Sequence, residues 1–144
     1  MFDYRILLQR CLLGFLVLCA MSLVGCSVNT KETEEETMKK NKYCQITMTE
    51  AVEMMKTETN YIILDARTHE EYNEGHIPGA ICIPNETIGS GDLSALPDKD
   101  QLILVYCRSG NRSKQASEKL VLLGYTNIVE FGGIRDWTGD IVTN

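Results

Sequence analysis

The sequence predicts an α/β fold in which a mostly parallel sheet of about five strands is covered by helices on both faces. The chain has 144 residues, which is the length of one domain. From residue 43 onward, short apolar runs alternate with segments that carry helix-capping signals. The runs are continuous rather than polar at every second position, and strands buried on both faces have this pattern.

The first two predicted helices begin at capping boxes, in which a glutamate follows a threonine in the first turn. Thr47 and Glu50 open the segment ITMTEAVEMMK, and Thr68 and Glu71 open THEEYNEG. A third helix is expected in RSKQASEKLVLLG, residues 112–124, which ends at a glycine. The strands are expected at 61–65, 81–83, 102–106 and 128–131, with a first strand near Cys44.

Residues 1–25 have the composition of an export signal. Arg5 and Arg10 precede an uncharged apolar run that is shorter than the roughly 20 residues of a membrane-spanning helix. The run ends in LVGC, which resembles the lipobox of bacterial lipoproteins. By that resemblance, this segment is a lipoprotein signal peptide, and the thiol of Cys26 carries a diacylglycerol group. An ordinary cleaved signal with a chance cysteine is the alternative.

Residues 26–42 comprise the lipidated cysteine and a flexible charged tether. The segment after Cys26 has almost no large apolar side chains and contains a glutamate cluster, so it cannot bury enough surface to fold. We expect the lipid anchor to hold the domain in the cell envelope, on the outer side of the cytoplasmic membrane or on the outer membrane. The formal net charge of −6 argues against a nucleic-acid partner.

Cys107 directly follows the predicted strand LILVY, and ligands of parallel sheets bind at the carboxyl ends of the strands. The helix that begins near Arg112 places its N-terminus there, where unpaired N–H groups and the helix dipole favour thiolate over thiol. Arg108 and Arg112 add positive charge. Gly110 and Asn111 tolerate left-handed backbone angles, so the loop can form an anion-binding nest. Such a loop activates a sulfur nucleophile and receives an anionic substrate.

Three motifs resemble those of the rhodanese-like sulfurtransferases. CRSGNRS, residues 107–113, is similar to the active loop of that family. DARTHEEYNEGHIPGA, residues 65–80, follows the family pattern D-x-R-x-x-x-E-Y-x-x-G-H-I-P-G-A, and GYTNIVEFGGIRDW, residues 124–137, matches a third motif. The resemblance implies a single rhodanese-like domain over residues 43–144.

The resemblance also implies a two-step transfer of sulfur. The Cys107 thiolate takes the outer sulfur of thiosulfate or a similar small anionic donor, sulfite leaves, and Cys107 becomes a persulfide. A thiol, from a small molecule or a thioredoxin-like protein, or cyanide then removes the sulfur. Neither a cofactor nor a metal is implied, and the two histidines fit no metal-ligand spacing.

The loop residues are the expected substrate-binding groups, because the persulfide is an anion that the same donors can hold. Asp65, Arg67 and His76 are expected to support the site. The first two are interpreted as a buried or partly buried ion pair near the loop, and His76 as a residue that holds the Gly-His-Ile-Pro-Gly turn. The substrate-binding set is Arg108, Ser109, Gly110, Asn111, Arg112 and Ser113.

Two alternatives to a sulfurtransferase remain open. The first is a phosphatase or arsenate reductase with a similar cysteine loop. Those enzymes need five residues between the cysteine and the arginine, whereas Cys107 and Arg112 enclose four and position 113 is serine, so the spacing argues against them. A sulfur carrier or binding module that serves one dedicated partner without turnover fits the same residues. Among the other cysteines, Cys82 is expected to be a small buried side chain within a strand, and no disulfide framework is evident.

Overall fold

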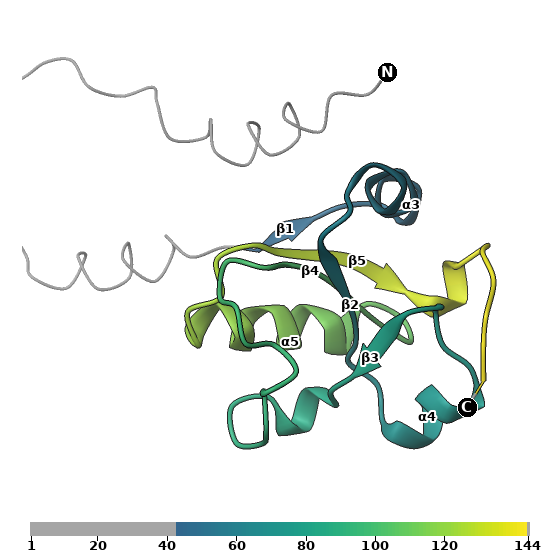
Figure 1. Cartoon of the computed structure of the whole chain (residues 1–144). Coiled ribbons are helices and arrows are strands. Elements are labelled where there is room, and N and C mark those ends of the chain that lie inside the picture. The colour runs from purple at the N-terminus through teal and green to yellow at the C-terminus, as the bar shows by residue number, and fades with distance from the viewer. Residues whose placement is uncertain (1–42, 144) are drawn as a thin grey trace, which may run out of the picture. The chain divides into compact units, whose positions relative to one another are not determined.

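A five-stranded parallel sheet, with the strand order β1-β5-β4-β2-β3, forms the centre of the structure (Figure 1). The computed structural model describes residues 43–143, so the predicted signal peptide, the lipid attachment at Cys26 and the tether lie outside the described residues. The strands are β1 (Cys44–Gln45), β2 (Tyr61–Asp65), β3 (Ala80–Cys82), β4 (Leu102–Cys107) and β5 (Ile128–Gly133).

Within residues 43–143, three α-helices and one short 3₁₀ turn connect these strands, and a second 3₁₀ turn follows the last strand. Thr47 and Thr68 are the N-cap residues of α3 and α4, and both capping boxes predicted from the sequence are present. In each box, the threonine side chain accepts a hydrogen bond from the glutamate N–H, and that glutamate's carboxylate accepts one from the threonine N–H. The helical segments are α3 (Met48–Thr57), α4 (His69–Glu74), η2 (Asn85–Thr87), α5 (Asn111–Leu122) and η3 (Ile134–Asp136).

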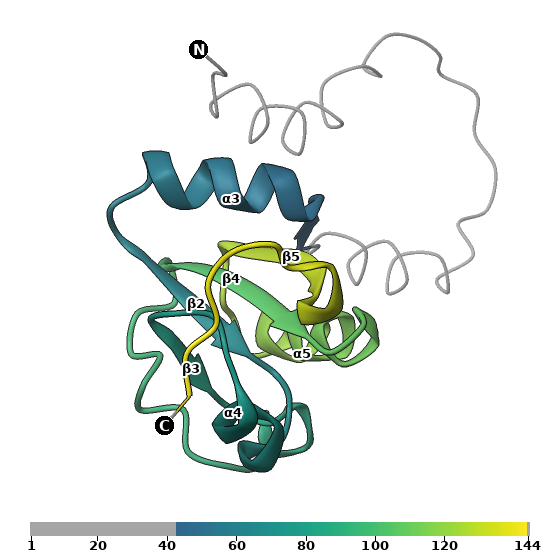
Figure 2. The same ribbon diagram turned by 90° about the vertical axis from the view of Figure 1, so that its right-hand side faces the viewer.

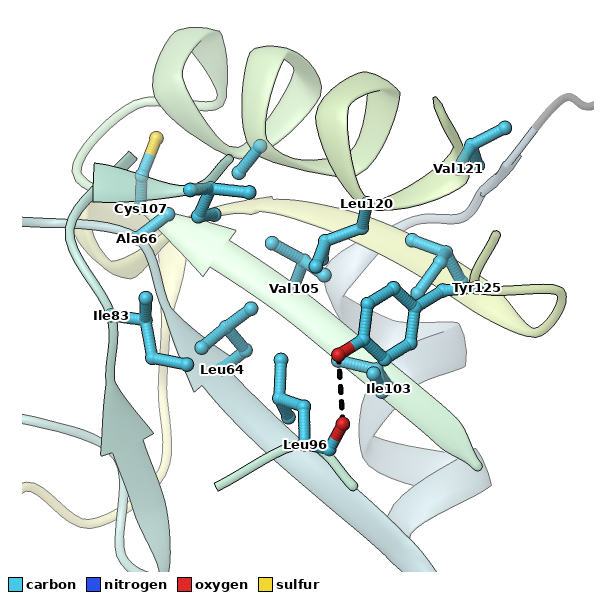
Figure 3. Close-up of a cluster of buried hydrophobic side chains, with 13 residues drawn as sticks. Leu64, Ala66, Ile83, Leu96, Ile103, Val105, Cys107, Leu120, Val121 and Tyr125 are labelled. Carbon is cyan, nitrogen blue, oxygen red and sulfur yellow. Dashed lines mark hydrogen bonds between the residues drawn. The ribbon is translucent and has the colours of Figure 1, made fainter. Parts of the chain in front are cut away.

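Strand β4 lies at the middle of the sheet, between β5 and β2, and all six of its residues are buried. Helix α5 covers one face of the sheet and α3 lies over the other (Figures 1 and 2). Along β4, Ile103, Val105 and Cys107 belong to the apolar cluster that includes Leu120 of α5 (Figure 3). Alternate residues point to the opposite face, as the pleat requires. The predicted α/β fold with helices on both faces is confirmed.

The strand boundaries agree closely with the prediction, with two informative differences. Strand β4 extends to Cys107, so the cysteine is the last residue of a strand rather than the first residue of a loop. Strand β3 is an edge strand, and Cys82 at its end is only partly buried. The prediction that Cys82 is a small buried side chain is therefore wrong, because an edge strand lacks a neighbour on one side.

Among residues 43–143, no helix is both long and apolar enough to cross a membrane. The same residues contain no cluster of three or more histidine, cysteine or acidic side chains that could hold a metal ion.

Candidate active site

The thiol of Cys107 lies where the central strand ends and α5 begins. Cys107 is 1% exposed, and Arg108 and Ser109 after it are exposed. Gly110 has a φ of 95°, in the left-handed region, and is the N-cap of α5. This turn folds the chain back so that the Gly110 N–H donates to Cys107 Sγ at 3.1 Å. Asn111 is already the first residue of α5, so the sequence expectation of a left-handed turn holds only for Gly110.

The surroundings of Cys107 favour its thiolate. Burial raises the pKa of Cys107, but the hydrogen-bond donors around the sulfur outweigh burial, so its pKa lies below the ordinary value. These donors are the hydroxyl and N–H of Ser113 and the N–H groups of Ser109 and Gly110. Donors that converge on the sulfur therefore come largely from the backbone of the loop and of the first turn of α5. A buried thiol with a lowered pKa is suited to nucleophilic attack.

Arg112 is held by an acidic side chain from a different element. Glu71, in α4, accepts two hydrogen bonds from the Arg112 guanidinium, at 2.6 and 2.8 Å. The hydrogen bond from Arg112 is the main reason why the pKa of Glu71 is lowered to about 2. In turn, Glu71 raises the pKa of Arg112, and the charge of Cys107 contributes in the same direction. Arg112 thus lies close enough to act on the sulfur, although its charge is shared with Glu71.

Asp65 and Arg67 form the buried ion pair that their positions indicated. The Arg67 Nη2 atom lies 2.6 Å from Asp65 Oδ2, and both side chains are almost completely buried. Arg67 Nη2 also donates to the carbonyl of Gly75, at 2.7 Å. The pair therefore joins the carboxyl end of β2 to the segment after α4. Support of the Cys107 site by this pair stays a prediction.

His76 lies in the segment that follows α4. Its ring stacks on Tyr72 with centroids 3.7 Å apart, and its Nδ1 atom lies 2.9 Å from the Tyr72 carbonyl oxygen. Its backbone pairs with Val142 near the C-terminus. These contacts match the predicted role in holding the turn, and they extend that role to the closing segment of the chain.

Glu130, for which the sequence indicated no role, lies directly behind the loop. Glu130 is 3% exposed, and its Oε1 atom accepts hydrogen bonds from the Ser113 hydroxyl at 2.6 Å and from the Gly132 N–H at 2.9 Å. Ser113 was expected to donate to the bound substrate, but its hydroxyl is buried and its shortest contact is to Glu130. The only sequence signal for Glu130 was an acidic residue within an apolar strand.

Gly132 and Gly133 allow the loop to approach β5. Gly132 has a φ of 96°, and a Cβ atom on Gly133 would lie 2.5 Å from the Arg108 carbonyl oxygen and 2.6 Å from Ser109 Cα. The pairing of β4 with β5 shifts register at this point, where Cys107 lies opposite Gly133. Gly132 and Gly133, two of the three glycines of the third motif, therefore allow the loop of residues 107–113 (the Cys107 loop) to pack closely against β5.

Residues 47–140 match the rhodanese-like domain family. The chain belongs to this family. The solved structure "rhodanese with anions from E. coli" is 36% identical, with a TM-score of 0.54, and the match covers 58% of this chain and 99% of that one. The resemblance inferred from the three motifs is thereby confirmed, as is the fold that it implied.

Two curated relatives show the range of functions in the rhodanese-like family. "Thiosulfate sulfurtransferase PspE" from Escherichia coli is 40% identical over 73 residues, covering 51% of this chain and 70% of that protein. "Putative sulfur carrier protein YrkF" from Bacillus subtilis is 38% identical over 80 residues, covering 54% of this chain and 41% of that protein. Other relatives are longer, and this chain covers 24% and 22% of two of them.

Proposed function

We propose that this rhodanese-like domain is a sulfurtransferase that carries sulfane sulfur on Cys107. The observation that carries the proposal is the nest of hydrogen-bond donors around a buried cysteine whose pKa is lowered. The same donors can stabilise a terminal persulfide sulfur, which is also an anion. The family relationship and a relative named thiosulfate sulfurtransferase support this reaction.

The reaction needs no proton donor in the loop. The Cys107 thiolate attacks the outer sulfur of thiosulfate, a new S–S bond forms, and the old S–S bond breaks with its electron pair leaving on sulfite. An acceptor thiolate or cyanide then attacks the terminal sulfur, and the bond to Cys107 breaks to restore the thiolate. Both leaving groups are stable anions, which fits a loop whose residues 107–113 include no acidic side chain and no histidine.

Intact-mass measurement of the full chain in detergent tests this proposal. Treatment with thiosulfate should add one sulfur atom, and cyanide or a thiol should remove it. A Cys107→Ser variant, which keeps the size of the side chain, should gain no mass. If the folded and reduced protein gains no sulfur from thiosulfate, persulfides or polysulfides, sulfur transfer by Cys107 is excluded.

A sulfur carrier with one dedicated partner is the second candidate function. It is favoured by the relative named putative sulfur carrier protein and by the ion pair that shares the charge of Arg112 with Glu71. Under this reading, Cys107 would accept sulfur from a partner's persulfide but turn over free thiosulfate slowly. Single-turnover transfer from a protein persulfide, compared with steady-state turnover of thiosulfate, separates the two functions.

We also propose that Cys26 anchors the domain to a membrane surface outside the cytoplasm. The basic N-terminal end, the uncharged apolar run and the LVGC sequence support this. The test is growth of the producing bacterium with a labelled fatty acid. The label should enter the wild-type chain and be absent from a Cys26→Ala variant. If the wild-type chain is secreted without the label, the protein is exported by an ordinary cleaved signal and is not anchored by lipid.

A further inference from the structure

Glu130 is a buried acidic side chain that the proposed reaction does not use. It lies in β5 opposite Val105 of β4, two residues before the cysteine in the neighbouring strand. A buried carboxylate is costly unless hydrogen bonds compensate it. Here the compensation comes from the Gly132 N–H and from the hydroxyl of Ser113, which lies in the first turn of α5. The Ser113 hydroxyl therefore links Glu130 to α5, the helix that follows the Cys107 loop.

The Ser113 hydroxyl has one proton and several acceptors. Its contact with Glu130 is 2.6 Å, the length of a charge-assisted O–H···O bond. The Gly110 carbonyl oxygen lies 2.9 Å away. The same hydroxyl is the leading group among those that lower the pKa of Cys107. In this structure the hydroxyl bonds to Glu130 and to two carbonyl oxygens, those of Gly110 and Gly132. Because one proton cannot serve two anions fully, it becomes available to an anionic sulfur at Cys107 only to the extent that its bond to Glu130 weakens.

We propose that Glu130 is a positioning residue that controls how much of the Ser113 hydroxyl proton is available to an anionic sulfur at Cys107. Glu130 touches neither the sulfur donor nor the reacting atoms in this scheme. It acts through Ser113, by competing with the thiolate or persulfide for one hydrogen bond. The buried carboxylate thus keeps the thiolate less stabilised, and therefore more reactive, than the loop alone would make it.

Other charged or titratable groups near this pair come from α5 itself, from α4 and from the segment before β1. Arg112 in α5 interacts with the charge of Cys107. Tyr43, just before β1, has a pKa raised first by burial and then by the charges of Glu118 and Glu130. Glu71 in α4 reaches the site through Arg112. Arginine and tyrosine do not change charge between about pH 5 and pH 9, so the competition can be measured in that range.

The experiment measures the rate at which Cys107 of the full chain reacts with iodoacetamide, as a function of pH, with the modified peptide identified by mass. Glu130→Gln keeps an oxygen that can accept from Gly132 and Ser113 but removes the negative charge. We expect the midpoint of the pH profile to fall by about one unit, which is a tenfold change in the thiolate equilibrium. Ser113→Ala should raise the midpoint.

The double variant decides whether the effect passes through Ser113. In the Ser113→Ala background, Glu130→Gln should shift the midpoint less than half as far as in the wild-type background. An equal shift in both backgrounds would mean that Glu130 acts by charge alone, and no shift or an upward shift in the single variant would mean that it does not compete with the sulfur. Either result overturns the proposal.

Two controls keep the test independent of folding and of the proposed function. Glu118→Gln removes an exposed negative charge that, like Glu130, acts on Tyr43, and it should leave the midpoint unchanged. Thermal unfolding of each variant shows whether it is folded at the temperature of the assay. The role inferred for Glu130 rests on the proposed sulfur transfer by Cys107. Alkylation by iodoacetamide needs no sulfur donor, so the alkylation test can contradict the role of Glu130 without contradicting sulfur transfer, and the reverse.

Discussion

The carboxylate of Glu71 holds the guanidinium of Arg112 through two hydrogen bonds of 2.6 and 2.8 Å, across 41 residues of sequence. Glu71 also completes the capping box of α4, because it accepts a hydrogen bond from the Thr68 N–H at 3.2 Å. One side chain therefore fixes the start of α4 and the last arginine of the Cys107 loop. The positive charge of the Cys107 loop therefore depends on side chains from both α4 and α5.

Replacing Glu71 should change the charge preference of the site. We expect Glu71→Gln to free the charge of Arg112 and to raise the rate of Cys107 alkylation by anionic iodoacetate, relative to neutral iodoacetamide, by about three- to tenfold. The ratio of the two rates cancels general changes in thiolate content. Glu70→Gln, at an exposed position of the same helix turn, is the matched control and should leave the ratio unchanged. A ratio that stays constant in both variants would show that Glu71 does not modulate the charge offered to substrate.

The same ion pair should make stability depend on pH in acid. The pKa of Glu71 is lowered from 4.5 to about 2 in the folded state. The stabilisation that ionised Glu71 adds to the free energy of unfolding is therefore complete above about pH 4.5 and is lost as the pH falls toward 2. The Glu71 and Arg112 side chains are 22% and 25% exposed, so we expect a contribution of about 1 kcal/mol rather than the full value of the shift. The free energies of unfolding by urea of wild type and Glu71→Gln should differ at pH 6, and the difference should narrow as the pH falls from 4.5 toward 2. A constant difference would show that ionisation of Glu71 is not the cause.

Gly133→Ala should displace the Cys107 loop. The added Cβ would lie 2.5 Å from the Arg108 carbonyl oxygen and 2.7 Å from the Ser109 N–H nitrogen, both of which are backbone atoms. We expect iodoacetamide to react with Cys107 at least about tenfold more slowly, because the donors around the sulfur move and a lower thiolate content results. Gly124→Ala is the control for stability, since its φ of 90° is strained but no atom lies within 4 Å of the added Cβ. It should lower stability and leave the reactivity of Cys107 intact.

Cys107 should react far faster than Cys82. Burial and the charge of Asp65 raise the pKa of Cys82 to about 11, whereas the loop lowers the pKa of Cys107. At pH 7.5 we expect a rate difference of at least about a hundredfold in the folded protein, because only the thiolate is nucleophilic. Peptide mapping after brief alkylation measures both sites in one sample. Comparable rates in folded protein would contradict the assignment of Cys107 as the activated cysteine, and equal rates in urea are the expected control.

Much of the fold and the position of the nucleophile could be predicted from the sequence. The capping boxes at Thr47 and Thr68, the continuous apolar strands and the place of Cys107 at a strand end are local patterns. Each depends on residues a few positions apart, so backbone preferences and hydrophobic periodicity are enough to indicate them. The sequence by itself therefore determined the α/β class, the parallel sheet and the position of Cys107 at the end of a buried strand.

Only the tertiary structure decided which side chains surround that cysteine. Arg112 looked like a free cation in the sequence, and its partner Glu71 is 41 residues away. Glu130 is 17 residues from Ser113, and the two meet because β5 pairs beside β4 while α5 packs across both strands. Such contacts depend on strand order and on where a helix crosses the sheet. No local pattern contains that information, because it arises only when separate elements pack around one core.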